Sequence, residues 1–216
     1  MVVYHLDKHG HLAAGMRLNV PFDDYFTTSL TRSECDAMFK TFPGGLSQFG
    51  YAVLAAKYSP AEIGLQVREL LLELVRRTCF PEKPSRLQSF FAAPSLRSIS
   101  SYWFHALRAE DSSSCLYACE VSRVYIADEA ELVRLRRIAL DPRVQPRTFE
   151  WPDEEPVLDR AVFPPSGIET ALQYWKSCEP LSDTYSDHTI RSMCADRGNP
   201  ELLVQGDIHV LHEVRL

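Results

Sequence analysis

The chain of 216 residues has 45% hydrophobic and 24% charged residues, which is typical of one folded domain. This composition excludes a disordered, collagen-like or coiled-coil chain. The formal net charge of -6 argues against a protein that binds nucleic acid mainly by neutralising phosphates. No apolar run reaches the roughly 18 residues that a membrane span needs. The start of the chain lacks the pattern of a signal peptide, so we expect a cytoplasmic protein with no membrane partner.

The sequence predicts strands near both ends of the chain and one long strand between them. Residues 2–6 are rich in β-formers, and residues 16–20 alternate up to a proline. Residues 115–127 predict a strand with a kink near Ser122. The apolar run over 201–214 is interrupted by Gln-Gly-Asp and predicts either two short strands or one bulged strand.

Helical periodicity is clearest between residues 60 and 78. Ser59 can cap this helix, Pro60 suits its first turn, and apolar residues recur at one-face spacing. Further helices are expected at 95–109, 128–140 and 166–177, and a buried strand at 87–92. Tyr174 and Trp175 are interpreted as core residues.

The remaining stretches are interpreted as irregular insertions in a single domain spanning residues 1–216. Residues 21–58 should form short helices and loops, and the proline-rich stretch 141–165 a long connection. Six cysteines are scattered along the chain, so we expect free thiols. The nearest pair, Cys115 and Cys119, lacks the spacing of a zinc site, and we expect no metal centre.

Phosphate-binding loops, dinucleotide-binding glycine patterns and common hydrolase or metalloprotease signatures are absent from the sequence. Polar residues within predicted strands are the remaining candidates for a site. His5 lies inside Val-Val-Tyr-His-Leu, where it is either a half-buried strand histidine bonded to a neighbour or a functional group. Glu201 heads an apolar strand, where its carboxylate is either exposed or directed into a cleft.

A third candidate is the segment 84–93, Pro-Ser-Arg-Leu-Gln-Ser-Phe-Phe-Ala-Ala. Its polar residues, among them Arg86 and Ser89, lead directly into the aromatic pair Phe90 and Phe91. The segment is either a capped turn before a core strand or a surface that combines hydrogen bonding with stacking.

In chain order, these segments resemble the ADP-ribosyltransferase fold of the class with a histidine, an aromatic or hydroxyl position and a glutamate. Tyr4-His5-Leu6 is similar to the first strand of the DNA-targeting transferases and the tRNA 2'-phosphotransferases. Phe-Phe-Ala-Ala at 90–93, with Ser98 and Tyr102 following, resembles the poly-ADP-ribose polymerase strand and helix. The stretch 200–208 resembles the strand that carries the catalytic glutamate. The chain also resembles a bacterial family of unknown function that carries Pro-Ser-Arg-aromatic-Gln-Ser-Phe-Phe-Ala, here with Leu87 at the aromatic position.

The resemblance implies an α+β fold with a split mixed sheet flanked by helices. It also implies NAD as substrate, with Glu201 stabilising positive charge at the ribose during cleavage. His5 would bind the adenosine ribose and the backbone of Leu6 the nicotinamide carboxamide. Arg86 would pair with the pyrophosphate, and Ser89 and Phe90 would line the nicotinamide pocket. Tyr102 would be a further cofactor-binding residue, whose hydroxyl compensates for the one missing at Phe90.

Two departures from the resembled pattern affect the expected activity. Phe90 stands where the polymerases have a tyrosine, so that hydroxyl is missing. Asn199 stands where the arginine-directed class has an acid or amide that orients its acceptor, which disfavours an arginine target. We therefore expect an NAD-dependent ADP-ribosyltransferase or NAD glycohydrolase that acts on an unidentified protein or nucleic-acid acceptor. The alternatives are an inactive nucleotide- or protein-binding module of the same fold and an RNA end-processing enzyme.

Overall fold

The structure is a computed structural model that describes residues 1–7, 10–20, 32–55, 60–96, 114–128, 130–132, 134–135, 165–181 and 200–215. Several predictions lie outside these residues: most of the helix at 95–109, Tyr102, the stretch 141–164 and Asn199. The elements are β1 (Val2–Asp7), β2 (Arg17–Val20), α2 (Arg32–Thr41), α3 (Gln48–Ala55), α4 (Pro60–Cys79), the 3-10 turn η1 (Arg86–Gln88), β3 (Phe90–Ala92), β4 (Cys115–Asp128), α7 (Pro165–Ser177), β5 (Glu179–Leu181) and β6 (Pro200–Glu213).

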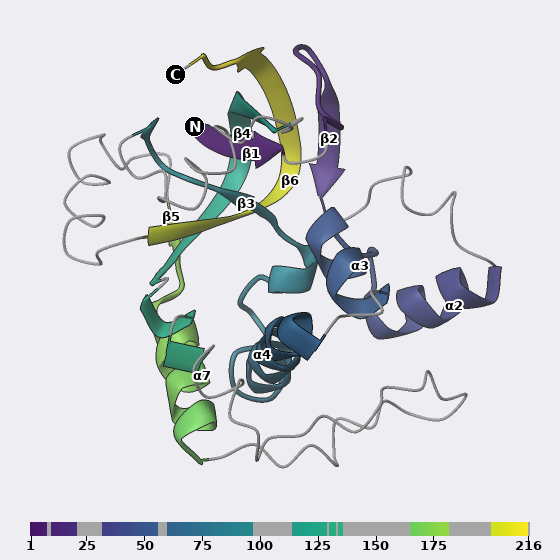
Figure 1. Ribbon diagram of the computed structural model, residues 1–216, viewed down its shortest axis with the longest axis vertical. Helices are drawn as coiled ribbons and strands as arrows, with labels where there is room; N and C mark the ends of the chain where they lie inside the picture. The colour runs from purple at the N-terminus through teal and green to yellow at the C-terminus, as the bar shows by residue number, and fades with distance from the viewer. Residues whose placement is uncertain are drawn as a thin grey trace.

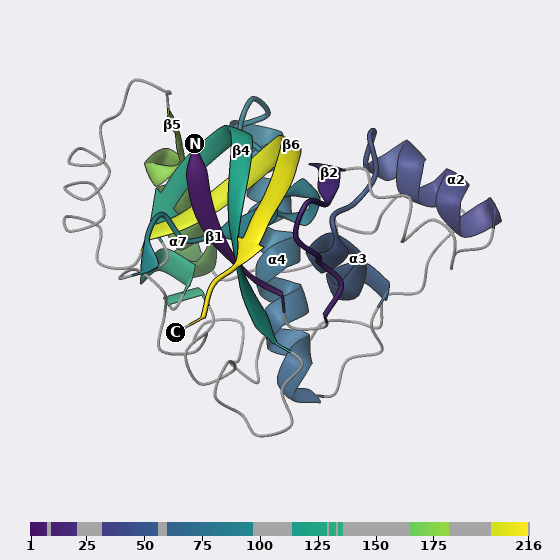
Figure 2. The same ribbon diagram turned by 90° about the horizontal axis from the view of Figure 1, so that it is seen from above.

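A six-stranded sheet forms the centre of the fold, with helices at one side (Figure 1). The strand order is β1-β4-β6-β2, while β3 pairs with β6 and β5 with β4. Seen from above, β1, β4 and β6 run side by side with α4 beneath them (Figure 2). The predicted α+β class is confirmed. Every pairing between the described strands is antiparallel, so the mixed sheet that the resemblance implies is not found among them.

The sheet curls so that its first strand meets β3 as well as β4. The Tyr4 and Ala93 backbones exchange two hydrogen bonds, with N to O distances of 2.9 and 2.7 Å. β6 is one continuous strand with a register shift opposite Ser122, where Gly206 has a φ of +82°. Only glycine adopts this conformation without strain. The bulged-strand alternative for β6 is therefore confirmed, and the bulge lies opposite Ser122, where the kink in β4 was predicted.

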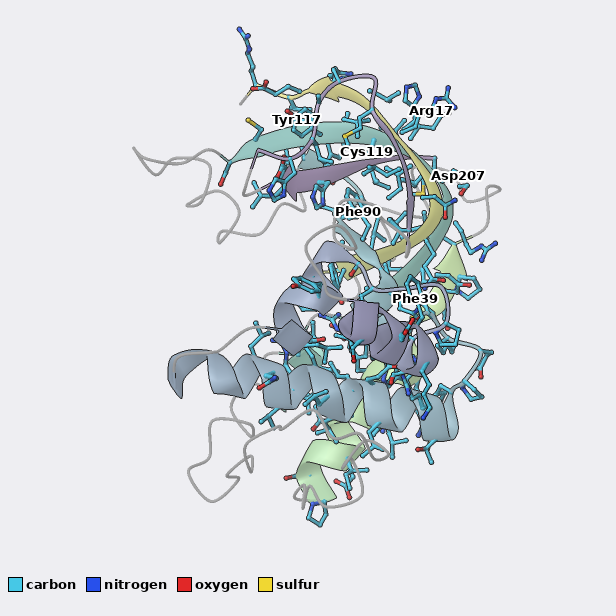
Figure 3. The ribbon with its side chains drawn as sticks, turned by 90° about the vertical axis from the view of Figure 1, so that its right-hand side faces the viewer. Arg17, Phe39, Phe90, Tyr117, Cys119 and Asp207 are labelled. Carbon is cyan, nitrogen blue, oxygen red and sulfur yellow. The ribbon has the colours of Figure 1, made fainter. Side chains whose placement is uncertain are left out.

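Apolar side chains form three clusters around this sheet. One lies within the curve of the sheet, where Figure 3 shows Phe90 and Cys119. A second joins the other face of the strands to α4 and α7, with Trp175 at its centre. The third joins α3 to η1 around Leu87. Leu87 and Phe91 of the segment 84–93 therefore pack on the helical side, whereas Phe90 packs within the curve of the sheet.

The helix predicted at 60–78 is α4, and that predicted at 166–177 is α7. The strand at 87–92 is shorter than predicted, because its first residues turn into η1. Amide groups of Gln88 and Ser89 bond back to the carbonyls of Ser85 and Arg86 there. The part of the stretch 21–58 that is described contains α2 and α3.

None of the cysteines described with their side chains, Cys79, Cys115, Cys119 and Cys178, forms a disulfide, as predicted. Burial raises the pKa of the Cys119 thiol to about 12, so this group stays protonated. Among the helices that the structure describes, none is both long and apolar enough to span a membrane.

Candidate functional site

A buried arginine organises the site. Arg86 lies in η1, and its side chain is 4% exposed. Its Nε donates to Glu69 Oε2 at 2.7 Å, and its Nη2 donates to Glu69 Oε1 at 3.3 Å. Nη1 donates to Tyr174 Oη at 2.7 Å and to the carboxylate of Glu201. All three guanidinium nitrogens therefore have acceptors inside the protein, as a buried charge requires.

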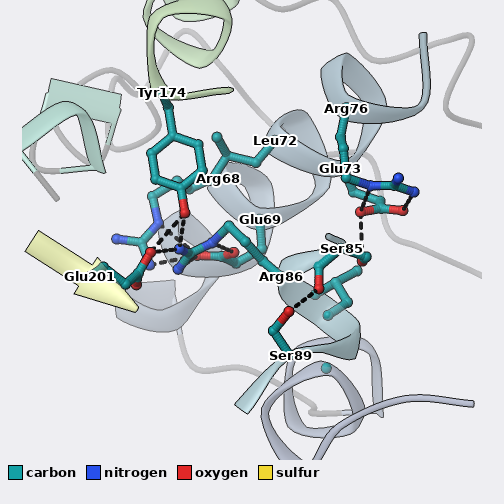
Figure 4. A network of polar contacts seen from close by, with 12 residues as sticks. Arg68, Glu69, Leu72, Glu73, Arg76, Ser85, Arg86, Ser89, Tyr174 and Glu201 are labelled. Atoms are coloured by element: carbon teal, nitrogen blue, oxygen red, sulfur yellow. Dashed lines mark hydrogen bonds and ion pairs between the residues drawn. The ribbon is translucent and has the colours of Figure 1, made fainter. Parts of the chain in front are cut away.

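Tyr174 and Glu201 complete the contacts on the side of Arg86 that is nearest the sheet (Figure 4). Tyr174 comes from α7 and is fully buried, and its hydroxyl donates to Glu201 Oε1 at 2.7 Å. Glu201 comes from the head of β6, and its side chain is 13% exposed. Both donors bind Oε1, and no hydrogen bond or ion pair joins Oε2 to the part of the chain that the structure describes. Glu201 is thus directed inward, and one of its two oxygens is held.

Glu69 of α4 closes the group on its other side. Arg68 donates to Glu69 Oε1 through Nη2 at 2.6 Å and through Nε at 2.9 Å. Burial alone would raise the pKa of Glu69, but the charges of Arg86 and Arg68 outweigh it and hold the pKa below its ordinary value. We call Arg68, Glu69, Arg86, Tyr174 and Glu201 the Arg86 cluster. Two guanidinium groups and two carboxylates make it electrically neutral.

Burial raises the pKa of the Tyr174 phenol well above its ordinary value, and the neighbouring Glu201 carboxylate adds to this effect. The Arg86 guanidinium acts in the opposite direction but does not reverse the shift. The pKa of Arg86 is in turn raised well above its ordinary value: burial opposes this, and the carboxylates of Glu201 and Glu69 outweigh it. Tyr174 therefore stays a neutral donor and Arg86 a cation across the pH range in which proteins are studied.

A second polar group, the Glu73 cluster, lies one turn further along α4 and consists of Glu73, Arg76, Arg77 and Ser85. Glu73 accepts from Arg76 Nη2 at 2.8 Å, from Arg77 Nε at 2.7 Å and from the Ser85 hydroxyl at 2.8 Å. Burial would raise the pKa of Glu73, but these donors hold it below its ordinary value. The two clusters thus anchor the consecutive residues Ser85 and Arg86 on consecutive turns of α4.

Ser89 belongs to the turn between these clusters. Its side chain is fully buried, and its hydroxyl donates to the Ser85 carbonyl at 2.7 Å. The resemblance implies a place for Ser89 in a nicotinamide pocket, whereas its hydroxyl serves the turn in this structure. This geometry corresponds to the capped turn before a core strand.

His5 makes a separate pair with the aromatic segment. Its ring stacks on Phe90 with a centroid distance of 3.8 Å and an interplanar angle of 26°. His5 Nδ1 lies 2.7 Å from the Phe91 carbonyl oxygen, so a tautomer with a proton on Nδ1 donates to it. The half-buried strand histidine with a bonded neighbour is therefore what the structure shows at this position.

The structure places Glu201 and the His5 ring on opposite faces of β3. Phe90 packs with the cluster inside the curve of the sheet, and Phe91 packs with the cluster on the helical side. The Arg86 guanidinium carbon lies 4.8 Å from the centroid of the Phe91 ring. Phe91 therefore connects the two groups, through its ring to Arg86 and through its carbonyl to His5.

The backbones of these groups are nevertheless close across the sheet. The register pairs Ala92 with Leu202, and its continuation by one residue sets Ala93 opposite Glu201. Ala93 is bridged to Tyr4 on its other side. Two strand spacings, about 10 Å, thus separate the backbones of Tyr4 and Glu201. Leu6, whose backbone was expected to bind nicotinamide, is buried and pairs with Leu116.

Sequence reasoning missed Glu69, Glu73 and the role of Tyr174. The apolar stripe on α4 suggested one buried face, but Glu69 and Glu73 are 1% and 3% exposed because η1 covers a second face. Their spacing of four residues, followed by consecutive polar residues Ser85 and Arg86, was the available signal. Tyr174 is a core residue as predicted, and its hydroxyl also binds Glu201.

A depression of about 480 Å³ lies away from these residues, on strands β2, β4 and β6. Arg17, Glu120 and His209 contribute polar groups to it, and His209 Nδ1 is 3.8 Å from Glu120 Oε2. Its lining includes neither His5, Arg86 nor Glu201.

Residues 3–215 match the family described as "Protein of unknown function (DUF2441)". The chain belongs to this family. No curated protein matches the sequence.

Proposed function

We propose that the chain is an NAD-cleaving enzyme, either an ADP-ribosyltransferase or an NAD glycohydrolase, with Glu201 as its catalytic carboxylate. The observation that carries the proposal is the position of Glu201 and the way its carboxylate is bound. This residue heads the strand that resembles the glutamate strand of the ADP-ribosyltransferases. Its side chain is 13% exposed, Oε1 accepts from Arg86 and Tyr174, and no described residue forms a hydrogen bond with Oε2.

Such a carboxylate suits the chemistry of NAD cleavage. The bond between nicotinamide and ribose breaks with its electron pair going to the nicotinamide nitrogen, which becomes neutral. The ribose develops oxocarbenium character and is attacked by water or by a nucleophile of the acceptor, which loses a proton. A fixed negative charge beside the ribose stabilises this positive charge, most strongly where water is excluded. Glu201 Oε2 would supply that charge.

Arg86 takes a different role in this proposal from pairing with the pyrophosphate. Its guanidinium nitrogens bind Glu69, Tyr174 and Glu201, and its side chain is 4% exposed. A pyrophosphate would have to replace these acceptors. Arg86 is therefore proposed as a residue that orients Glu201. His5 and Phe90 remain candidates for contact with the nucleotide through the edges of their stacked rings.

The second candidate function is an inactive nucleotide- or protein-binding module of the same fold. It is favoured by the separation of the two groups, since Glu201 faces the helical side and the His5 ring faces the inside of the curved sheet. The Glu201 carboxylate is also paired with Arg86, which offsets its charge. In this alternative, the Arg86 cluster serves only to hold β6, α4 and α7 together.

Nicotinamide release from NAD by the purified protein decides between the two functions. The wild type is compared with Glu201→Gln, which keeps the size of the side chain and removes its charge, and with His5→Ala. The enzyme hypothesis predicts release by the wild type, at least a hundredfold less by Glu201→Gln, and a raised KM for NAD with His5→Ala.

Thermal unfolding of each variant, with and without NAD, is the companion measurement. A folded Glu201→Gln protein that still gains stability from NAD shows that binding survives and only cleavage is lost. Stabilisation of the wild type by NAD without nicotinamide release supports the binding module. If NAD is neither cleaved nor stabilises the protein, a role for NAD is contradicted.

A further inference from the structure

We propose that Tyr174 is a positioning residue that, together with Arg86, fixes Glu201 by Oε1 so that Oε2 faces the substrate. This inference rests on the proposed function. Tyr174 comes from α7, which carries no residue of the resembled motifs. The family match assigns it no role, and its sequence position next to Trp175 suggests only a core residue.

The geometry around the hydroxyl carries the inference. Tyr174 Oη accepts from Arg86 Nη1 at 2.7 Å and donates to Glu201 Oε1 at 2.7 Å. Arg86 Nη1 also contacts the same carboxylate oxygen. Three groups thus meet pairwise, and two donors from different elements converge on one oxygen. A carboxylate held in this way cannot rotate to exchange its oxygens without breaking both contacts.

The ring of Tyr174 is fixed as firmly as its hydroxyl. It is fully buried, lies edge-on to Trp175 with a centroid distance of 4.9 Å, and packs in the cluster between α4, α7 and the sheet. Trp175 is itself held by a hydrogen bond from Nε1 to the Leu72 carbonyl at 2.7 Å. Because the phenol stays protonated, its donor is present at every working pH. The position of Glu201 is therefore set by the packing of α7 against α4 and not by β6 alone.

Tyr174→Phe tests the proposal because it removes one oxygen and keeps the ring. Its effect is measured alone and combined with Glu201→Gln, by urea unfolding and by nicotinamide release. We expect the two substitutions to be coupled, so that their joint effect on the unfolding equilibrium constant differs from the product of the single effects by roughly fivefold or more. We also expect kcat to fall roughly tenfold to a hundredfold while KM for NAD stays within about twofold, since a misplaced group affects the reaction more than binding.

Two other tyrosines provide matched controls. Tyr117 is also buried and donates its hydroxyl to the Leu12 carbonyl at 2.9 Å, away from Glu201. Tyr117→Phe should lose a comparable hydrogen bond but show no coupling to Glu201→Gln. Tyr125 packs against the same core cluster as Tyr174, and Tyr125→Phe should leave kcat unchanged.

The unfolding and activity results separate the two ways in which the proposal can fail. Additive unfolding effects of Tyr174→Phe and Glu201→Gln overturn the contact, whatever the activity. Coupling with an unchanged kcat, in a protein whose release depends on Glu201, overturns the positioning role and leaves the proposed function intact. Absence of release from the wild type overturns the proposed function and, with it, a role for Tyr174 in catalysis, even where the coupling is present.

Discussion

The Arg86 cluster and the Glu73 cluster begin from the same helix but differ in what they connect. Glu69 and Glu73 lie four residues apart on α4, and both are buried. Through Glu69 and Arg86, the first cluster reaches α7 and the head of β6. The second joins the end of α4 to the adjoining loop through Ser85 and Arg76, and to the end of α2 through Arg77, but it makes no hydrogen bond to a described strand.

This difference distinguishes the Arg86 cluster, a candidate functional site, from the Glu73 cluster, which only stabilises the fold. The Arg86 cluster contains a carboxylate, Glu201, that is 13% exposed and has one oxygen to which no described residue donates a hydrogen bond. In the Glu73 cluster, the partly exposed groups are Arg76 and Arg77, at 12% and 32%, and they hold the end of the helix to nearby carbonyls. A buried charge network is therefore not by itself a sign of function. The sign is a network that reaches the sheet and ends at one accessible reactive group.

The largest effect is expected from Arg86→Met. This change leaves the fully buried Glu69 with only Arg68, and a broken buried ion pair costs about 3–5 kcal/mol. Urea unfolding measures the loss. Adding Glu69→Gln to Arg86→Met should recover part of the stability, because the unpaired charge is then removed. Costs that simply add in the double variant would show that Glu69 and Arg86 act independently.

The next largest effect on stability is expected from neutralising the carboxylates of Glu69 and Glu73, one in each variant. Glu69→Gln removes the charge that balances a fully buried guanidinium and should cost about 2 kcal/mol. Glu73→Gln removes pairs to arginines that reach solvent and should cost about 1 kcal/mol. Thermal and urea unfolding of the two variants side by side give the comparison. Equal costs would mean that the longer reach of the Arg86 cluster adds nothing to stability.

The same comparison shows how much of the molecule could be predicted from the sequence. Local signals were sufficient for α4, α7, β4 and the bulged β6, because periodicity, caps and a Gln-Gly-Asp interruption act within a few residues. The α+β class followed from these elements. The start of η1 was missed, because hydrogen bonds within Ser85 to Ser89 override the strand propensity of the apolar residues.

The candidate site could be predicted only in part. Glu201 and Arg86 were singled out, but their contact joins positions 115 residues apart, and no spacing rule reports such a pair. The burial of Glu69 could not be predicted from the sequence, because it depends on the packing of η1 over α4. Tyr174 was correctly placed in the core, yet the hydrogen bond from its hydroxyl to Glu201 depends on how α7 packs against α4 and the sheet. Tertiary packing, and not local propensity, decides these contacts.

The pH dependence of stability gives a third test. The folded-state pKa values of Glu69 and Glu73 lie below the ordinary carboxyl value of 4.5. Their contribution to stability is therefore fully present above about pH 4.5 and is lost as the pH falls through the lowered pKa values. In urea unfolding between about pH 7 and pH 3, the free energy of unfolding should fall less steeply with falling pH in Glu69→Gln and in Glu73→Gln than in the wild type. The same pH dependence in Glu69→Gln as in the wild type would contradict the lowered pKa of Glu69.

The smallest effect is expected from Ser89→Ala, at the turn that links the clusters. The Ser89 hydroxyl donates to the Ser85 carbonyl at 2.7 Å, but that carbonyl also accepts from the Gln88 amide at 3.1 Å. Losing the hydroxyl therefore leaves no orphaned acceptor, and the cost should be about 0.5–1 kcal/mol in urea unfolding. Because Ser89 is fully buried and bonded within the turn, KM for NAD should not change. A raised KM with unchanged stability would instead place Ser89 in the nicotinamide pocket, as the resemblance implies, and would mean that this turn opens when NAD binds.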